Sequence, residues 1–212
     1  MEYYVPTRDG ESEFTEKRSR FIGHIRKVET EEEARAFLTD MKAKYHDARH
    51  NCWCYLLREG GVMRYSDDGE PQGTAGQPML EVFRREGVEN LCCVVTRYFG
   101  GVLLGAGGLV RAYTRSAKET LDAVGISVVR RWIETVVDCP YPLLERMKLE
   151  VASAQGVLGE LEYGASVHLH AFLPEEGIDE FTKQVAELTA GQIIPQLLGD
   201  RFREMPRPLR TD

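Results

Sequence analysis

A strand, a glycine-rich loop and a helix follow one another in residues 91–113, which read LCCVVTRYFGGVLLGAGGLVRAY. Residues 91–95 form a continuous apolar run of strand length, which predicts a buried central strand. Residues 98–108 predict a loop because they are rich in glycine. From Leu109 onward apolar residues recur at helical spacing, and Gly125 is placed to end that helix. The stretch therefore predicts a domain that contains both α-helices and β-strands. The free backbone amides at the start of its helix are expected to lie beside the glycine loop.

The residues before this stretch predict further elements of the same domain. Residues 21–28 and 52–57 have the composition of strands. Thr30 and Glu33 form the pattern of a capping box and are followed by apolar residues at helical spacing, which predicts a helix between those strands. Residues 66–71 read SDDGEP, and this composition favours a turn.

The second half of the chain predicts a separate domain. Its expected elements follow the order βαββαβ, which is the ferredoxin-like arrangement. We therefore predict an α+β protein of two domains, the first over residues 1–135 and the second, ferredoxin-like, over residues 136–212. The expected elements of the second domain are strand 134–139, helix 142–155, strand 157–163, strand 166–173, helix 178–190 and strand 196–203.

Composition and charge restrict the class of protein. The chain has 212 residues, of which 42% are hydrophobic and 29% charged, the balance of a globular protein with a real core. The formal charge of −7 gives no whole-protein attraction for nucleic acid or anionic membranes, so any contact with a polyanion requires a local patch. Residues 1–135 carry 20 Lys and Arg against 21 Asp and Glu, whereas residues 136–212 carry 7 against 13. The acidic second domain is therefore expected to contact protein rather than phosphate.

The expected location is the cytoplasm. No apolar run approaches the roughly 18 residues of a membrane-spanning helix. The polar amino terminus does not have the pattern of a signal peptide, so no membrane contact is expected. The five cysteines are an odd number in a chain too large to need disulfides, which predicts reduced thiols.

The glycine loop has the composition of a phosphate cradle. Glycines let backbone amides approach a ligand, and the free N–H groups at a helix start attract an anion. Arg97 and Arg111 would close on that anion, and Tyr98, Phe99 or Tyr113 would stack a base if the anion belonged to nucleic acid. The candidate phosphate-binding or nucleic-acid-binding residues are Arg97, Tyr98, Gly100, Gly101, Gly105, Gly107, Gly108, Arg111 and Tyr113.

A purely structural role for the same loop stays open. In that interpretation the glycines serve close packing and tight turns, and Arg97 and Arg111 pair with acidic neighbours such as Asp67 or Asp68. The loop matches neither the Walker pattern nor the dinucleotide fingerprint, which disfavours ATP hydrolysis and hydride transfer.

The polar residues near the loop do not complete a catalytic or metal site. Residues of metal-ligating type are His46, His50, Cys52 and Cys54, but their spacing supplies no tetrahedral set, so we predict no metal. A nucleophile pair of Cys52 or Cys54 with His50 has no feature that would lower a thiol pKa. Asp67 and Glu70 offer an acid and base pair, although a turn is the simpler role. No catalytic residue and no cofactor are assigned.

Three segments together resemble the signature of the IMPACT family of small proteins. The first is His50-Asn51-Cys52, the second is residues 67–76 (DDGEPQGTAG), and the third is residues 97–113. The resemblance spans residues 46–113 and shows no departure within them. Outside the glycine loop its residues are His50, Asp67, Asp68, Gly69, Glu70, Pro71, Gly73, Thr74 and Gly76.

The resemblance implies a fold and a setting for the protein. The first domain is expected to be of the type of the second domain of ribosomal protein S5, a fold shared with a translocating elongation factor and with kinases that bind phosphate on a glycine-rich loop. The second domain is expected to be ferredoxin-like and similar to an elongation-factor domain. A role around translation follows by that analogy. The family offers no catalytic residue set to transfer.

Three hypotheses of function follow. The first is a non-enzymatic protein that binds RNA or the ribosome through the glycine loop and regulates translation, with the acidic second domain contacting a protein partner. The second is a small-molecule phosphate-binding protein or enzyme that uses the same loop, with a divalent metal held by Asp67, Asp68 or Glu70. The third has the signature loop dock a protein instead of a phosphate.

Overall fold

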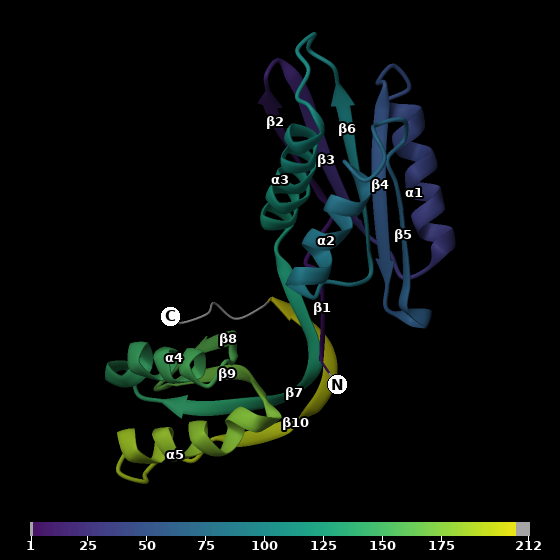
Figure 1. The fold of residues 1–212 in the computed structure, drawn as a ribbon. Helices are drawn as coiled ribbons and strands as arrows, with labels where there is room; N and C mark the ends of the chain where they lie inside the picture. Colours follow the sequence, from purple (N-terminus) through teal and green to yellow (C-terminus); the bar gives the residue numbers. More distant parts are fainter. Residues whose placement is uncertain (1, 207–212) are drawn as a thin grey trace. The chain divides into compact units, whose positions relative to one another are not determined.

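The structure is a computed structural model that describes residues 2–206. It divides into two compact units (Figure 1), an amino-terminal unit of residues Tyr3–Ser127 and a carboxy-terminal unit from Val128 onward that also takes in Glu2. The predicted α+β class with two domains is confirmed. The division between the units falls within strand β7 (Ile126–Cys139), and the boundary expected at residues 135 and 136 lies in the same strand.

The two units contain the following helices and strands. In the amino-terminal unit they are β1 (Tyr3–Pro6), β2 (Gly10–Glu16), β3 (Ser19–Lys27), α1 (Glu31–Lys44), β4 (His50–Leu57), β5 (Val62–Ser66), α2 (Gly76–Glu86), β6 (Leu91–Tyr98) and α3 (Ala106–Val124). Strand β7 (Ile126–Cys139) is followed by α4 (Leu144–Ser153), β8 (Val157–Tyr163), β9 (Val167–Pro174), α5 (Ile178–Leu188) and β10 (Gln196–Pro206).

The amino-terminal unit is built on one antiparallel sheet with the strand order β2-β3-β6-β4-β5. Strand β6 is central, as the apolar run of residues 91–95 predicts. In the register of this sheet Arg97 pairs with both Phe21 and His50. The end of β6, the start of β4 and the start of β3 therefore lie at the same edge of the sheet, which we call the loop edge.

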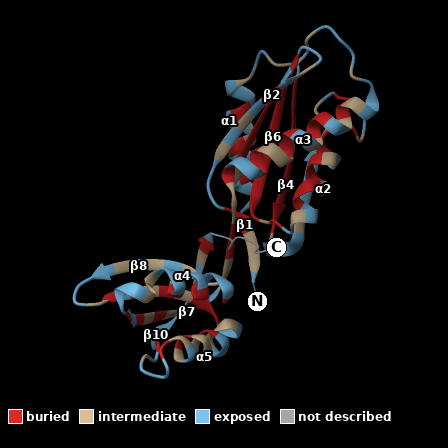
Figure 2. Cartoon of the chain, turned by 90° about the vertical axis from the view of Figure 1, so that its left-hand side faces the viewer, coloured by how far each residue is buried: buried red, intermediate tan, exposed pale blue. Residues whose placement is uncertain are grey.

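The two faces of this sheet are covered by different helices (Figure 2). Alternate residues of a strand point to opposite faces, so Cys54 and Cys93 pack with α2 and α3 while Tyr55 and Cys92 pack with α1. The inner strands β3, β6 and β4 are thus buried on both sides, and the residues that fill them are mostly apolar for that reason.

Two helix boundaries of this unit follow from local chemistry. The capping box at the start of α1 is present as predicted, because the Thr30 side chain accepts from Glu33 N and the Glu33 carboxylate accepts from Thr30 N. Gly125 ends α3 with φ of 76°, a conformation that residues with a Cβ rarely adopt. At its start α3 differs from prediction, since it begins at Ala106 rather than Leu109, and Gly107 and Gly108 lie in its first turn.

Three strands, and the start of a fourth, differ from the sequence prediction. Strands β1, β2 and β5 were not predicted, and β2 and β5 together bury only one residue, so they lack the apolar signal of a buried strand. The strand expected over residues 134–139 begins earlier and forms one continuous strand over residues 126–139. The charged pair in its middle does not interrupt it, because Arg130 is paired with Glu2 and Arg131 with Asp200.

The carboxy-terminal unit has the predicted ferredoxin-like order of elements. Strand β9 lies between β7 and β8 and is antiparallel to both, while β10 pairs with β7. The apolar core joins these strands to α4 and α5 through fully buried residues such as Met147, Leu169 and Phe181. None of the helices within residues 2–206 is both long enough and apolar enough to cross a membrane.

Removal of the α1 cap tests the first of these boundaries. Thr30→Ala should lower the free energy of unfolding by roughly 1 kcal/mol because one amide at the helix start loses its partner. Urea denaturation measures this change. Thr39→Ala, at an exposed position within the same helix, is the matched control and should leave stability within about 0.5 kcal/mol of the wild type. Equal stability of all three proteins would contradict the capping role.

Candidate functional site

A buried ion pair lies at the centre of the loop edge. Arg97 at the end of β6 donates from Nη1 to Glu70 Oε1 at 2.6 Å, and both side chains are almost fully buried, at 6% and 4% exposure. Nη2 of Arg97 donates to Ser19 Oγ at 3.3 Å. The guanidinium carbon lies 5.5 Å from the ring centroid of Phe21 and 5.5 Å from that of Phe99. A charged pair removed from water in this way requires good geometry to offset its desolvation.

The pair is extended by α3 and β4. Tyr113 on α3 donates its hydroxyl to Glu70 Oε1 at 2.9 Å, and Cys52 Sγ lies 3.3 Å from that hydroxyl. Burial, with Cys52 and Glu70 as neighbours, raises the pKa of Tyr113, and burial raises the pKa of the Cys52 thiol. Both groups therefore stay protonated and act as donors rather than as a base or a nucleophile.

Asp67 organises the turn that carries Glu70. Its Oδ1 accepts from Ala75 N at 3.0 Å and from Gly76 N at 2.8 Å, and its Oδ2 accepts from Gly73 N at 2.8 Å. This carboxylate caps the start of α2. Ala75, the residue at the N-cap position, supplies no side-chain hydrogen bond of its own. A Cβ on Gly76 would lie 2.8 Å from the Ser66 carbonyl oxygen, so only glycine fits there.

The same turn is fastened to the start of β4. Asp68 Oδ2 accepts from Asn51 N at 2.7 Å, and the Asp68 carbonyl oxygen accepts from His50 Nδ1 at 2.9 Å. Thr74 donates its hydroxyl to the Pro71 carbonyl oxygen at 2.6 Å. The residues of the second signature segment thus hold one turn in a fixed shape.

The glycine loop packs on the hairpin turn between β2 and β3. A Cβ on Gly100 would lie 2.0 Å from the Arg18 carbonyl oxygen, so only glycine can occupy this position. The hairpin turn is Lys17-Arg18, closed by the pair Glu16 and Ser19. Its two residues have φ of 43° and 66°, the positive values of a type I′ turn, for which Asn-Gly would be the usual sequence. Each such residue costs about 1 kcal/mol or more, and strain of this kind concentrates at functional sites.

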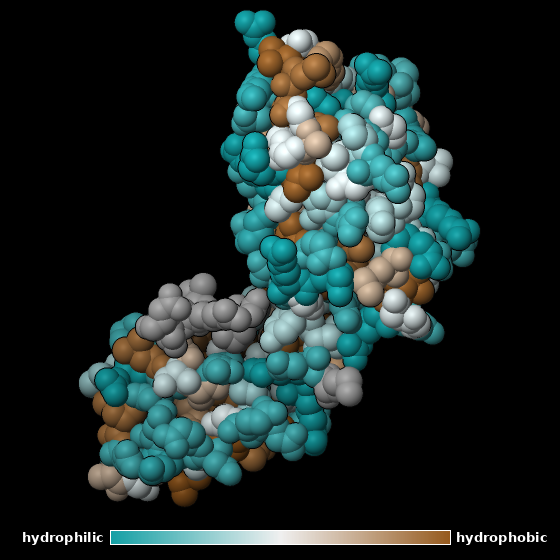
Figure 3. All heavy atoms as spheres, in the orientation of Figure 1, coloured by the Kyte–Doolittle hydropathy of each residue, from teal (hydrophilic) through white to brown (hydrophobic). Residues whose placement is uncertain are grey.

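A cavity of about 340 Å³ opens between the glycine loop and the turn of Glu70. We call it the loop cavity. Its lining includes Arg49, His50 and Arg97, the exposed apolar side chain of Leu103, and Gly105 and Ala106 at the start of α3. Figure 3 shows apolar atoms gathered at the end of the amino-terminal unit where the loop between β6 and α3 lies.

Positive groups without ion-pair partners lie at the loop edge, and one of them, Arg49, lines this cavity. Within residues 2–206, no carboxylate lies within ion-pair distance of the four exposed or half-buried side chains that we call the cationic rim, namely Lys17, Arg18, Arg49 and Arg111. Lys17 and Arg111 share a smaller hollow of about 210 Å³ that Glu16 also lines, and Leu104 lines both this hollow and the loop cavity.

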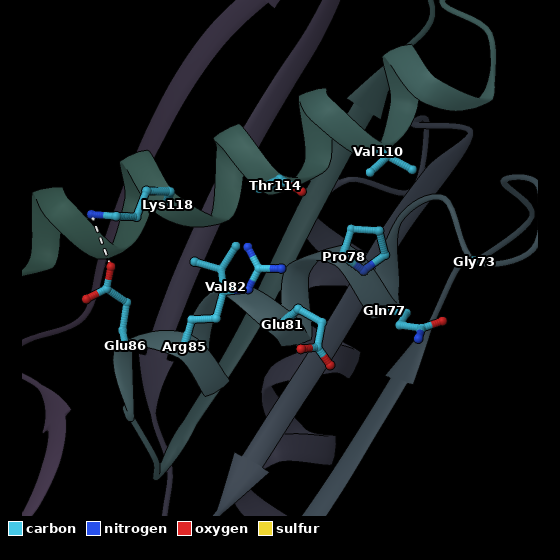
Figure 4. A pocket seen from close by; sticks show the side chains of 10 residues that line it. All are labelled: Gly73, Gln77, Pro78, Glu81, Val82, Arg85, Glu86, Val110, Thr114 and Lys118. Atoms are coloured by element: carbon cyan, nitrogen blue, oxygen red, sulfur yellow. Dashed lines mark ion pairs between the residues drawn. The ribbon is translucent and has the colours of Figure 1, made fainter.

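A third and larger hollow lies between α2 and α3 (Figure 4). Its volume is about 620 Å³, and it is lined by Pro78 and Val82 of α2 and by Val110 and Thr114 of α3. Lys118 and Glu86 at one end are paired at 3.6 Å. Of the predicted site residues only Gly73 reaches it.

The structure changes the roles expected for two predicted residues. Tyr113 is fully buried, so it cannot stack a base. Arg97 is paired with an acid, as the structural interpretation expected, but the acid is Glu70 rather than Asp67 or Asp68. Arg111 takes no part in the ion pair of Arg97 and Glu70. Its Nη1 would lie 3.5 Å from a Cβ on Gly107, which places the guanidinium beside the first turn of α3.

The other predicted site residues lie at the loop edge as follows. Gly101 and Gly105 have positive φ in the loop, a Cβ on Gly108 would lie 3.0 Å from Leu104 Cβ, and Tyr98 donates to Asp47 Oδ1 at 2.8 Å. Gly69 has φ of 85° beside the His50 ring. The sequence shows basic residues crowding the first strand, Lys17 and Arg18 among them, and predicts a local positive field if they share a surface with Arg97 and Arg111, but it does not single out Arg49. Lys17-Arg18 has no turn-forming composition, so only the clustering of basic residues near residue 20 could have pointed to it.

The predicted absence of a metal is not tested by the structure, but the ligand types can be located. Within residues 2–206, no group of three or more His, Cys, Asp and Glu side chains is placed to hold an ion. Cys52 and Cys54 lie on the same face of β4, as their spacing predicts, and they belong to the apolar core.

The family models match both units of the chain. The Impact N-terminal domain matches residues 17–121, which include the buried ion pair, the glycine loop and the cationic rim, and a domain of unknown function (DUF1949) matches residues 137–192. The IMPACT family member YvyE of Bacillus subtilis is 39% identical over 90% of this chain and 88% of its own length. The chain belongs to the IMPACT family.

Further relatives agree with this assignment. The IMPACT family member YigZ of Escherichia coli is 34% identical over 84% of this chain and 88% of its own length. A solved structure described as a crystal structure of a hypothetical protein has a TM-score of 0.58, 33% identity, and covers 93% of this chain and 97% of its own. The IMPACT homologue of Dictyostelium discoideum matches only 58% of this chain and 35% of its own length, at 33% identity. Both units are therefore shared with the bacterial members of the IMPACT family.

Substitution of Arg97 and Glu70 tests how the buried ion pair affects the free energy of unfolding. Arg97→Ala should lower the free energy of unfolding by about 3–5 kcal/mol, because it leaves Glu70 charged and unpaired in the interior. The double variant Arg97→Met/Glu70→Leu should recover most of that loss, since neither charge remains buried. Urea denaturation of the three proteins makes the comparison. A double variant as unstable as the single one would show that something other than the charge imbalance is responsible.

The thiols provide a second test. All five cysteines are buried and free, and burial raises the pKa of Cys92 to about 12. We expect no fast reaction of the native protein with iodoacetamide at pH 8 and five modified thiols after denaturation. Because the folded-state pKa lies above the ordinary value of 9.0, the unfolded state loses protons first as pH rises, and stability should fall above pH 9.0. One native thiol that reacts as fast as free cysteine would contradict this.

Proposed function

We propose that this IMPACT family member is a non-enzymatic, cytoplasmic RNA-binding protein that acts around translation, and that it holds RNA phosphates at the loop edge of its amino-terminal unit. The observation that carries the proposal is the cationic rim of Lys17, Arg18, Arg49 and Arg111, none of which has a described carboxylate within ion-pair distance. Phosphate contacts of this kind supply most of the affinity of a protein for nucleic acid.

Cations next to the rim are paired with acids, whereas those of the rim are not, and this contrast supports the proposal. Arg20 next to the rim is bound to Glu13 through two nitrogens, and Arg115 next to Arg111 is bound to Glu119 at 2.7 Å. The chain therefore carries acids that neutralise some of the cations of this region and leaves the rim uncompensated. The rim is the local positive patch that a chain of net charge −7 needs in order to approach a polyanion.

The strained hairpin turn also supports the proposal. Asn-Gly at positions 17 and 18 would satisfy the positive φ values, yet the chain has two cations there. A protein is expected to keep charged residues in a strained turn, at a cost in stability, where those charges serve binding.

Residues suited to contact a base lie beside the rim. Phe99 is 44% exposed and Leu103 is 82% exposed in the loop. Aromatic side chains next to cations are the usual stacking surface for unpaired bases. The carboxy-terminal unit would contact a protein partner, in keeping with its 7 basic and 13 acidic residues beyond residue 135.

The hairpin turn offers a test that separates charge from folding. Lys17→Asn/Arg18→Gly should be at least as stable as the wild type because it relieves the strain, while its affinity for a structured RNA should fall severalfold. The slope of log Kd against log salt should drop by about two phosphate contacts, or roughly 1.4–1.8. Fluorescence anisotropy of labelled RNA across a salt series measures both quantities.

The matched control is Arg35→Ala. Arg35 lies on α1, is 74% exposed, and is paired with Glu31 away from the rim. It should bind RNA as the wild type does. Equal affinity and an equal salt slope in the wild type and the turn variant would remove the rim from the RNA site.

A further inference from the structure

We infer that the loop cavity recognises one nucleobase, guanine, with an unpaired guanine of an RNA strand as its source. The inference rests on the proposed RNA-binding function, because the cationic rim would bring the strand to the cavity. It goes beyond that function in assigning a particular base to a particular pocket, and it identifies His50 and Glu70 as the residues that determine specificity.

His50 presents a hydrogen-bond acceptor to the cavity. Its Nδ1 lies 2.9 Å from the Asp68 carbonyl oxygen, and because a carbonyl oxygen can only accept, Nδ1 carries the proton. In the neutral imidazole the other ring nitrogen, Nε2, is then an acceptor. The residue lines the cavity and is only 8% exposed. Nε2 has no hydrogen-bond partner within residues 2–206, yet it is not sealed from solvent as Arg97 Nε is.

Glu70 presents a second acceptor to the same cavity. Its Oε1 accepts from Arg97 Nη1 at 2.6 Å and from the Tyr113 hydroxyl at 2.9 Å. Its Oε2 has no partner in the described part of the chain and is likewise not sealed from solvent. Glu70 lines the loop cavity. Because the bonds to Oε1 fix the carboxylate, its free oxygen is held in place before a ligand arrives.

The surroundings of these acceptors select the class of ligand. Two free acceptors in a largely buried site call for a ligand with two donors. An ammonium or guanidinium group has such donors, but the cations of the rim, of which Arg49 lines the cavity, disfavour a positive ligand and favour one on an anionic tether. The half-exposed ring of Phe99 and the exposed side chain of Leu103 also line the cavity and suit a flat apolar body. A nucleobase on its phosphate backbone meets all three requirements.

Among the four RNA bases, guanine alone offers two adjacent donors. Its Watson–Crick edge carries N1–H and the N2 amino group side by side. Adenine and cytosine place an acceptor nitrogen beside the amino group, and uracil has one N–H between two carbonyl acceptors. These three bases would set an acceptor against His50 Nε2 or Glu70 Oε2, which leaves polar atoms unpaired in a buried site.

The state of the guanine follows from the edge that it uses. The Watson–Crick edge is occupied in a duplex, so the guanine that enters the cavity has to be unpaired. The volume of about 340 Å³ lies near the lower end of the range for small-molecule sites, which suits a single base rather than a base pair. The cavity is therefore expected to select guanine in single-stranded RNA.

The experiment compares single nucleosides within one RNA. A short single-stranded RNA of uridines carries guanosine, adenosine, inosine or 7-deazaguanosine at one central position, and fluorescence anisotropy gives the Kd of each. Inosine lacks the N2 amino group, whereas 7-deazaguanosine keeps both donors and loses the N7 acceptor. We expect the guanosine and 7-deazaguanosine RNAs to bind about tenfold more tightly than the adenosine and inosine RNAs, the size of a hydrogen bond to a charged group.

The same titrations can contradict the inference in three ways. Affinities within twofold of one another for all four RNAs would overturn it, but binding that still weakens with salt and in the variant of the hairpin turn would uphold the proposed function. The two failures are thus distinguishable. A 7-deazaguanosine RNA as weak as the inosine RNA would place recognition at N7 and overturn the assignment of the acceptors. Failure of all four RNAs to bind would overturn the proposed function and this inference with it.

A substitution in the cavity tests the place of binding. His50→Phe keeps an aromatic ring and removes the Nε2 acceptor, so the preference for guanosine over inosine should fall to within twofold. The readout is the ratio of the two affinities within each protein, so a general effect on folding or RNA binding cancels. A preference that persists unchanged in His50→Phe would overturn the assignment.

The matched control is His46→Phe. His46 is exposed and does not line the cavity, and its Nδ1 lies 3.2 Å from the Ala43 carbonyl oxygen, a bond of the same kind as that of His50. The control should keep the full preference for guanosine. Loss of the preference in both variants would show that it does not depend on the cavity and would overturn the inference.

Competition separates the two sources of guanine. GMP should displace the labelled guanosine RNA at a lower concentration than IMP, because IMP lacks the N2 amino group. The unlabelled RNA should displace it at a lower concentration than GMP, since the rim contacts further phosphates of a strand. Tighter binding of GMP than of the RNA would support the guanine site and assign it to a free nucleotide. Equal displacement by GMP and IMP would overturn recognition of the base.

Discussion

The buried ion pair of Glu70 and Arg97 is the interaction on which the loop edge depends. It joins four segments that are distant in sequence, since Arg97 ends β6, Glu70 lies in the turn after β5, Ser19 begins β3, and Tyr113 belongs to α3. A pair of this kind adds little net stability, because the desolvation of two charges offsets much of their attraction. Its consequence is geometric. With the pair in place, the turn and the glycine loop stand on opposite sides of one cavity.

Backbone features then decide what surrounds that cavity. Gly100 allows the loop to lie against the backbone of Arg18, which brings a cationic turn beside the helix start. Gly105 lets the chain enter α3 with φ of 72° and without a capping side chain. The result is a group of cations without ion-pair partners on a chain of negative charge, with Asp67 engaged at the start of α2 and Glu70 with Arg97.

Much of the fold could be predicted from sequence because its signals are local. The apolar run of β6, the capping box at Thr30 and the βαββαβ order each depend on near neighbours. The partner of Arg97 could not be predicted in this way, since Asp67, Asp68 and Glu70 are equally near in sequence and only the turn geometry assigns Asp67 to α2 and Glu70 to Arg97. The burial of Tyr113 likewise depends on which face of α3 meets the sheet.

The most direct test of this account is a titration of isotopically labelled protein with RNA, followed by backbone amide chemical shifts. The account predicts that the earliest and largest changes occur at Lys17 and Arg18 in the hairpin turn and at Ala106 and Gly107 in the first turn of α3, and that the carboxy-terminal unit changes little. Changes concentrated in residues 128–206, or an unchanged loop edge at saturating RNA, would contradict it.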